Sequence, residues 1–164
     1  LEMASLSYGY AITTYVGQNL GAKKYRRIRN GVRSGVYMAL ITSIVISGVM
    51  VITGRNILSL FVSGEAGQVK QVLDIAYKYL FIMAIFLWVL YLLYVYRSAI
   101  QGLGNTLIPL ASGVVEFCMR VGVALLLPKL IGEDGIFYAE ISAWSGAAIL
   151  LIVSYVVIIR KYKE

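Results

Sequence analysis

The stretch SGVYMALITSIVISGVMVIT, residues 34–53, decides the fold, because its 20 positions hold no charged side chain. A helix needs about 20 mostly apolar residues to cross the hydrocarbon core of a membrane. Comparable stretches occupy residues 75–96, 106–128 and 136–159, and a less apolar one occupies residues 3–22. We therefore predict an all-α polytopic membrane bundle of about five transmembrane helices, forming a single membrane domain over residues 1–164.

The composition excludes the soluble classes of protein. Hydrophobic residues make up 60% of the chain and charged residues 14%, whereas soluble domains average about 45–50% and 25%. The chain has no histidine, a single cysteine and no aspartate pair inside the apolar stretches, so we expect neither an enzyme active site nor a bound metal or cofactor. Cys118 lies in an apolar run and is expected to be a buried thiol.

Basic residues gather on one side of the predicted membrane. Six lie in Lys23–Arg33, three lie in residues 160–163, and Arg97 follows the third helix. The positive-inside rule makes this side cytoplasmic, so we predict a multi-pass protein of the inner cell membrane with a cytoplasmic carboxy terminus. The longest outer connection is residues 54–74, and residues 55–61 within it are expected to form a short interfacial helix.

Small residues recur at every fourth position in the second predicted helix. The set is Gly31, Gly35, Ala39, Ser43 and Ser47. Such a stripe lets another helix approach closely, so we predict a packing seam. A seam that also moves during function is compatible with the pattern, but the residues themselves support only the packing role.

Two charges lie deep in the fourth predicted helix. Ser112, Glu116 and Arg120 are four residues apart, so they share one helix face. A charge near mid-membrane costs roughly 2.5–3.5 kcal/mol on insertion scales, so such residues face a bundle interior or a cavity. Glu116 and Arg120 are either a neutralised structural pair or part of a polar path for substrate or coupling ion. Glu140, one turn into the last helix, is expected to be an exposed interfacial carboxylate, with a cation site as the alternative.

Tyr91 and Tyr94 also have two interpretations. Most tyrosines of the chain lie near predicted helix ends, where aromatic side chains anchor a protein at the membrane interface. The same two side chains can line a pocket for aromatic cations.

Two glycine-containing segments are expected to form cytoplasmic helix ends. Residues 101–106, QGLGNT, suit a tight turn in which Asn105 or Thr106 caps the next helix. Residues 17–22, GQNLGA, suit a helix that ends on a glycine cap. Residues 101–106 are not a nucleotide-binding loop, because no strand precedes them and no lysine follows their glycines.

Taken in order, these segments resemble the multidrug and toxic compound extrusion (MATE) family. The similarity rests on residues 13–24 (TTYVGQNLGAKK), residues 58–61 (LSLF), residues 97–106 (RSAIQGLGNT), and the stretch from Pro109 through Glu116 to Arg120. The motif residues are Gly17, Gln18, Gly21, Gln101, Gly102, Gly104 and Asn105. Their order and spacing look like the second half of that family's carboxy-terminal lobe.

The resemblance implies helices eight to twelve of a twelve-helix transporter that is built from two six-helix lobes. Such proteins export cationic or amphipathic drugs in exchange for protons or sodium ions. The implied partners are these compounds, the lipid bilayer and an amino-terminal lobe, but no nucleic acid. The chain starts at Leu1 with no visible signal peptide, so we expect a carboxy-terminal fragment of a longer protein.

The residues expected along the substrate or coupling path are Glu116, Arg120, Ser112, Tyr91 and Tyr94. Sodium-coupled members of the family carry a carboxylate in the helix that corresponds to residues 75–96. This helix has no acidic residue in its interior here, so that sodium site is not visible.

Two further functions remain open. One is a flippase for lipid-linked oligosaccharides in the same superfamily, against which the segments around residues 17–18 and 101–106 favour the exporter. The other is a small membrane scaffold, which coding sequence upstream of Leu1 would exclude.

The topology is testable by labelling single cysteines on a Cys118→Ala background. An impermeant thiol reagent added outside the cell should modify cysteines at residues 65–70 and 132–135 but not at residues 24–29, because only the basic segments are predicted to be cytoplasmic. The opposite labelling pattern would reverse the topology.

Overall fold

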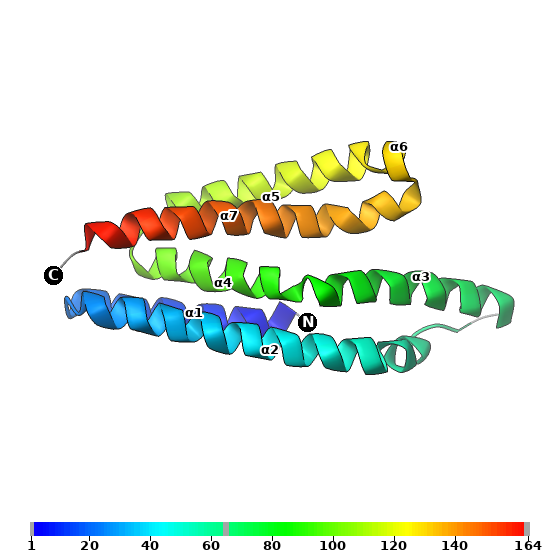
Figure 1. Cartoon of the computed structure of the whole chain (residues 1–164), viewed down its shortest axis with the longest axis horizontal. Coiled ribbons are helices and arrows are strands. Elements are labelled where there is room, and N and C mark those ends of the chain that lie inside the picture. The colour runs from blue at the N-terminus through cyan, green and yellow to red at the C-terminus, as the bar shows by residue number, and fades with distance from the viewer. Residues whose placement is uncertain (1, 64–65, 163–164) are drawn as a thin grey trace.

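The computed structural model describes residues 2–63 and 66–162, and every regular element in these ranges is a helix (Figure 1). The elements are α1 (Glu2–Gly21), α2 (Tyr25–Ser59), α3 (Ala66–Ile85), α4 (Leu87–Gly102), α5 (Leu107–Leu126), α6 (Pro128–Ile131), the 3-10 helix η1 (Glu133–Ile136) and α7 (Phe137–Lys161). The all-α prediction is confirmed. Residues 65 and 163, which belong to the predicted outer and basic segments, lie outside the described residues.

Fewer helices qualify as membrane spans than the five expected. Three described segments are long and apolar enough, namely Tyr25–Ser59, Leu107–Ile131 and Asp134–Lys161, and the bent pair α3–α4 makes a fourth if it is one span. The first helix, α1, has 20 residues, which is about 30 Å at 1.5 Å per residue. It does not qualify, since glycines and amides dilute its apolar content.

The second helix is longer at both ends than its apolar stretch. Most of the basic segment Lys23–Arg33 is not a loop, because α2 already begins at Tyr25. At the other end α2 continues to Ser59 and α3 starts at Ala66, so residues 55–61 do not form a separate interfacial helix. Charged and amide side chains are acceptable in a helix once it has left the apolar layer.

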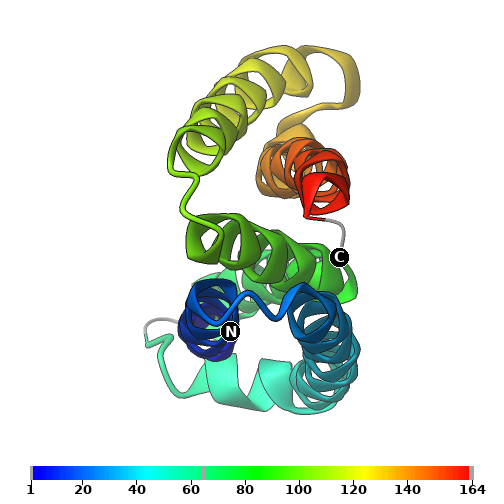
Figure 2. The same ribbon diagram turned by 90° about the vertical axis from the view of Figure 1, so that its left-hand side faces the viewer.

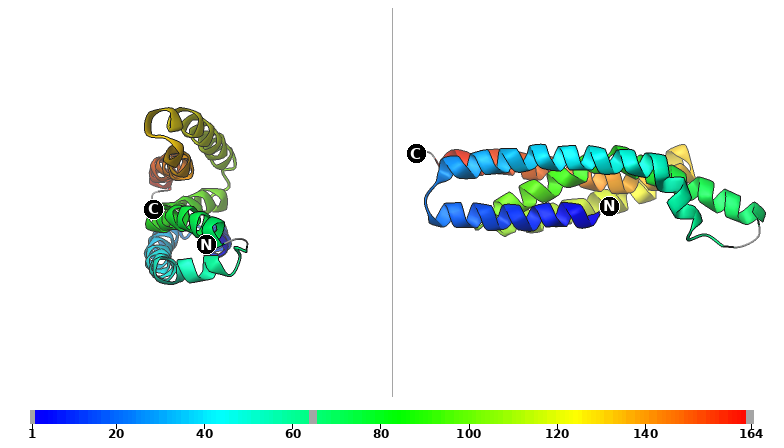
Figure 3. Two further views of the ribbon diagram at one scale, coloured as in Figure 1. Left: turned by 90° about the vertical axis from the view of Figure 1, so that its right-hand side faces the viewer. Right: turned by 90° about the horizontal axis from the view of Figure 1, so that it is seen from below.

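The helices are arranged in three layers, and α4 forms the middle one. Viewed along the bundle, α1 and α2 form one side, α4 crosses the middle, and α5 and α7 form the other side (Figure 2). The α1–α2 turn, the α4–α5 turn and the end of α7 share one end of the bundle, whereas α3 extends past the opposite end (Figures 1 and 3). The core is richest in α4, where Leu87, Tyr91, Leu93 and Ile100 are almost completely buried.

Small residues let α1 pack tightly against α2 and α4. A Cβ atom at Gly35 would lie 2.5 Å from Ile12 Cδ1 of α1, so α1 occupies the predicted stripe of α2. On α4, a Cβ atom at Gly102 would lie 2.7 Å from Val16 Cβ and 2.9 Å from the carbonyl oxygen of Thr13. The predicted packing seam is confirmed, and Gly102 forms a second seam of the same kind.

The single helix expected over residues 75–96 is interrupted at Phe86. The axes of α3 and α4 differ there by 49°, although neither proline nor glycine is present. Ser47, the last member of the small-residue stripe, donates a hydrogen bond of 2.5 Å to the carbonyl oxygen of Ala84. A side chain that binds a backbone carbonyl from outside the helix is a recognised cause of a helix kink, and here it comes from α2.

One face of α5 has no protein neighbour among the described residues. Only Pro109 and Ser112 of this helix are buried. Its exposed apolar residues include Leu107, Leu110, Val114, Phe117 and Leu125. Cys118 is also exposed, so the expectation of a buried thiol is wrong. In a membrane such a face is stable against lipid, because hydrocarbon chains are as apolar as the side chains.

The close approach at Gly102 predicts a specific loss of stability. Gly102→Ala should destabilise the protein by about 1–3 kcal/mol, because the backbone of Thr13 cannot yield to the added methyl group. Gly48→Ala is the matched control, since a Cβ atom there has nothing within 4 Å and alanine favours a helix. Thermal unfolding in detergent measures both. A Gly102→Ala variant that melts at or above the wild-type temperature would contradict the tight seam.

Candidate functional site

Four charged side chains from three helices form a continuous chain of ion pairs, which we call the charge ladder. Arg97 on α4 donates to Glu116 on α5 over 2.6 Å, and Arg120 on α5 donates to Glu140 on α7 over 2.7 Å. Glu116 and Arg120 join the two pairs at 3.5 Å, one helical turn apart. The ladder therefore contains two positive and two negative groups and is neutral as a whole.

The ladder lies where an isolated charge is most costly. Glu116 is nine residues beyond the start of α5 at Leu107, or about 14 Å along the helix, which is close to the middle of a hydrocarbon layer of about 30 Å. The side chains of Arg97 and Glu116 are 21% and 19% exposed. Because their charges compensate each other, the helices can carry them at this depth.

Ser112 extends the ladder toward the α4–α5 turn. Its Oγ accepts a hydrogen bond of 3.2 Å from Arg97 and donates one of 2.7 Å to the carbonyl oxygen of Pro109. The prediction that Ser112, Glu116 and Arg120 share one face is therefore matched by contacts of all three within the ladder.

Arg97 is not among the site residues predicted from the sequence, because its position after an apolar stretch is typical of a cytoplasmic charge. Arg97 lies inside α4, five residues before its last residue Gly102. A usable signal was present: α4 and α5 are joined by the short turn 103–106, and Arg97 and Ser112 are equally far from its midpoint. Two antiparallel helices bring such positions opposite each other.

The Glu116–Arg120 pair expected from the i, i+4 spacing is present at 3.5 Å, but the carboxylate nearest to Arg120 is Glu140, at 2.7 Å. The expectation for Glu140 is wrong. Glu140 is not a free interfacial carboxylate, since its side chain is 25% exposed and paired. The Arg120–Glu140 pairing does not follow from the spacing within one helix, because it depends on which helix lies next to α5.

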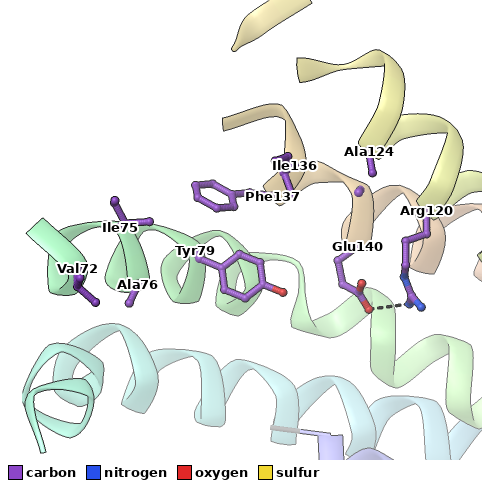
Figure 4. Close-up of a pocket in the computed structure, with 10 residues that line it drawn as sticks. Val72, Ile75, Ala76, Tyr79, Arg120, Ala124, Ile136, Phe137 and Glu140 are labelled. Carbon is purple, nitrogen blue, oxygen red and sulfur yellow. Dashed lines mark hydrogen bonds and ion pairs between the residues drawn. The ribbon is translucent and has the colours of Figure 1, made fainter. Parts of the chain in front are cut away.

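A pocket of about 620 Å³ lies beside the Arg120–Glu140 pair, between α3, α5 and α7. Its walls are mostly apolar and include Val72, Ile75 and Phe137, and the hydroxyl of Tyr79 is turned toward the ion pair (Figure 4). An apolar pocket with one ion pair at its edge suits an amphipathic ligand, which needs both an apolar surface and an opposite charge.

The two candidate tyrosines lie in different surroundings. Tyr91 is completely buried and packs against Tyr8, with ring centroids 6.0 Å apart, which places it in the core. Tyr94 lines a small pocket of about 180 Å³ together with Arg97 and Gln101. Tyr94 is therefore the one of the two that adjoins the ladder.

The remaining motif residues build the helix ends at the basic end of the bundle. A Cβ atom at Gly17 would contact the carbonyl oxygen of Gly102, and Gly104 has a φ angle of +81°, which favours glycine. Asn105 accepts a hydrogen bond of 3.1 Å from the backbone N–H of Ile108 and so caps α5, as predicted for Asn105 or Thr106. The backbone carbonyl oxygen of Gln18 accepts a hydrogen bond of 3.1 Å from the backbone N–H of Ala22.

The ladder residues offer no evident metal site. The described residues contain no group of three or more His, Cys, Asp and Glu side chains that could hold a metal ion. Gly21 is the last residue of α1, and a Cβ atom there would have no neighbour within 4 Å.

A family model described as MatE matches residues 1–126, which is most of the 164-residue chain. The matched region ends with α5 and contains Arg97, Glu116 and Arg120, whereas Glu140 on α7 follows it. No curated protein matches the chain significantly.

The geometry of the ladder predicts which second substitution should restore the stability that Glu116→Gln loses. Glu116→Gln should destabilise the protein by roughly 3 kcal/mol, because it leaves the half-buried Arg97 with Ser112 as its remaining partner. Adding Arg97→Gln to the Glu116→Gln variant should restore most of the lost stability. Adding Arg120→Gln to the same variant should restore less of it. Asp74→Asn is the control: its pair with Arg55 is about half exposed and should matter by less than about 1 kcal/mol.

Thermal unfolding and the monodisperse fraction after gel filtration measure these differences. Equal rescue by Arg97→Gln and Arg120→Gln would show that Glu116 does not prefer Arg97.

Proposed function

We propose that this chain, which belongs to the MATE family of multi-pass membrane transporters, exports cationic or amphipathic compounds in exchange for protons or sodium ions. Members of this family are transporters rather than enzymes, so the charge ladder and its pocket are to be understood as parts of a transport path. The observation that carries the proposal is the pocket beside Arg120 and Glu140.

The pocket suits a cationic amphiphile for two physical reasons. Apolar walls from α3 and α7 offer surface to an aromatic or aliphatic body, as drug-sized ligands require. Glu140 offers a carboxylate to the cation, and Arg120 is already within 3.5 Å of a second carboxylate, Glu116. When a cation takes Glu140, Arg120 can move fully to Glu116, so its charge is not left unpaired.

The same exchange of partners offers a route for coupling. A proton or sodium ion that reaches Glu116 or Glu140 weakens the hold of that carboxylate on its arginine, and a cationic compound competes for the same group. Two cations that compete for one carboxylate cannot both be bound, which is the physical requirement of an antiporter. Ser112, which accepts a hydrogen bond from Arg97, and Tyr94, which lines the same small pocket as Arg97, would adjust Arg97 during this exchange.

The proposal includes the placement of the chain in the cell. The basic ends of α2 and α7 lie at the same end of the bundle (Figure 1), which supports a cytoplasmic position for them in the inner membrane. We further propose that the chain is most of a carboxy-terminal lobe, and that an amino-terminal lobe completes the translocation path.

Transport of a fluorescent cation tests the function and the site separately. Cells or vesicles with the full-length protein should export ethidium when a proton or sodium gradient is imposed, and export should stop when both gradients are collapsed. Gradient-independent movement of the dye, or none at equal abundance of the protein, would refute the antiport proposal.

Within that assay, Glu140→Gln should reduce ethidium export about tenfold or more, equivalent to at least about 1.4 kcal/mol of lost stabilisation. Asp134→Asn is the matched control, because Asp134 forms an exposed pair with Lys78 at the same end of the bundle. Export by Glu140→Gln at the wild-type rate and abundance would exclude this pocket from the path.

A further inference from the structure

A second groove lies between α2 and α7, at the basic end of the bundle and away from the charge ladder. It has a volume of about 410 Å³, and α4 contributes Tyr96 to it. Arg29 and Arg33 line one part, and Val32, Val36 and Ile159 form an apolar wall beside them. The groove therefore combines two cationic groups with an apolar wall.

The two arginines are held in place, and no described carboxylate neutralises them. Arg29 donates a hydrogen bond of 2.5 Å to the carbonyl oxygen of Tyr162, at the end of α7. Arg33 donates to the hydroxyl of Tyr37 over 3.2 Å and lies 5.6 Å from the centre of its ring. In the described part of the chain, no carboxylate forms a salt bridge with either arginine. Both guanidinium groups keep N–H donors for an anion.

Tyr155 also lines the groove and carries a buried hydroxyl. Tyr155 is 8% exposed, and its hydroxyl has no hydrogen-bond partner among the described residues. Buried hydroxyls normally have a partner. Tyr155 lies seven residues before Tyr162, or about 10 Å from the end of α7 along the helix. A ligand group that forms a hydrogen bond with the Tyr155 hydroxyl must therefore lie further from the basic end of the bundle than a group bound by the arginines.

The groove opens onto a surface that suits hydrocarbon. Beyond Tyr37, the outward face of α2 exposes Ile41, Ile44 and Val45. A ligand with an anionic head at the arginines can therefore continue along an apolar surface into the membrane. A free phosphate ion would leave the apolar wall and Tyr155 without a partner.

We propose that this groove binds an anionic phospholipid of the leaflet at the basic end of the bundle. The lipid phosphate accepts hydrogen bonds from Arg29 and Arg33, an ester carbonyl of the glycerol accepts one from Tyr155, and an acyl chain packs along Val32, Val36 and Ile159. Basic pockets between transmembrane helices bind anionic headgroups in this way. The lipid would join α2 to α7, which lie on opposite sides of α4.

Photolabelling of the wild-type protein tests the location. A diazirine-bearing phosphatidylglycerol should label residues 32–37 and 155–159 more strongly than the matching phosphatidylcholine, and an excess of inorganic phosphate should not remove the label. Equal labelling by the two lipids, labelling elsewhere, or loss of label to inorganic phosphate would each overturn the proposal. This measurement needs no variant and therefore does not depend on how a variant folds.

Variants then test the residues, with phosphatidylglycerol titrated into the purified protein and bound lipid counted by native mass spectrometry. Arg29→Gln with Arg33→Gln should weaken apparent affinity about 30-fold, roughly a factor of five for each basic group. Lys24→Gln with Arg27→Gln removes the same charge outside the groove and should weaken it by less than about threefold, because separated charges are screened.

Tyr155→Phe removes only the hydroxyl and should weaken apparent affinity about fivefold, as expected for one hydrogen bond. An equal loss in the two double variants would show general attraction to a basic surface, and no loss in Arg29→Gln with Arg33→Gln would show that the groove is not the site. Either result would overturn the proposal.

Discussion

Charge neutrality inside an apolar layer is the constraint on which the arrangement of α4, α5 and α7 depends. Arg97, Glu116, Arg120 and Glu140 come from three helices, and each would be costly to leave unpaired at its depth. Their short contacts fix how α5 is rotated and how far it is shifted along its neighbours. Apolar packing also places α5, since Val115 and Met119 lie against Gly146 of α7, and the polar contacts add the pairing of specific charges.

The small residues of α1, α2 and α4 make that arrangement possible. Gly35 lets α2 approach α1 closely, and Gly102 lets α4 approach the same helix, so α1 and α2 hold α4 from the side away from α5. The same stripe on α2 ends in Ser47, which binds the carbonyl of Ala84 beside the break between α3 and α4. One pattern of small residues thus serves both close packing and the change of direction that lets α3 line the pocket.

A neutral ladder is also a reasonable physical basis for transport. Arg120 lies 2.7 Å from one carboxylate and 3.5 Å from another, so a modest movement changes its partner without separating charge. The proposed lipid groove lies between α2 and α7, apart from this ladder and near the basic helix ends. A lipid there would act on the relative position of α2 and α7, whereas a substrate at Glu140 would act on α5 and α7.

The sequence alone determined the helical class, the approximate apolar stretches, the stripe on α2 and the shared face of Ser112, Glu116 and Arg120, because these follow from composition and the helical period. It also determined the family resemblance through residues 13–24 and 97–106, which lie within the matched region. Only the tertiary structure decided that Arg97 binds Glu116, that Arg120 binds Glu140, and that the helix over residues 75–96 breaks at Phe86. The physical reason is the same in each case, since the deciding group lies on a different helix and no periodicity within one segment reveals which neighbour that helix will have.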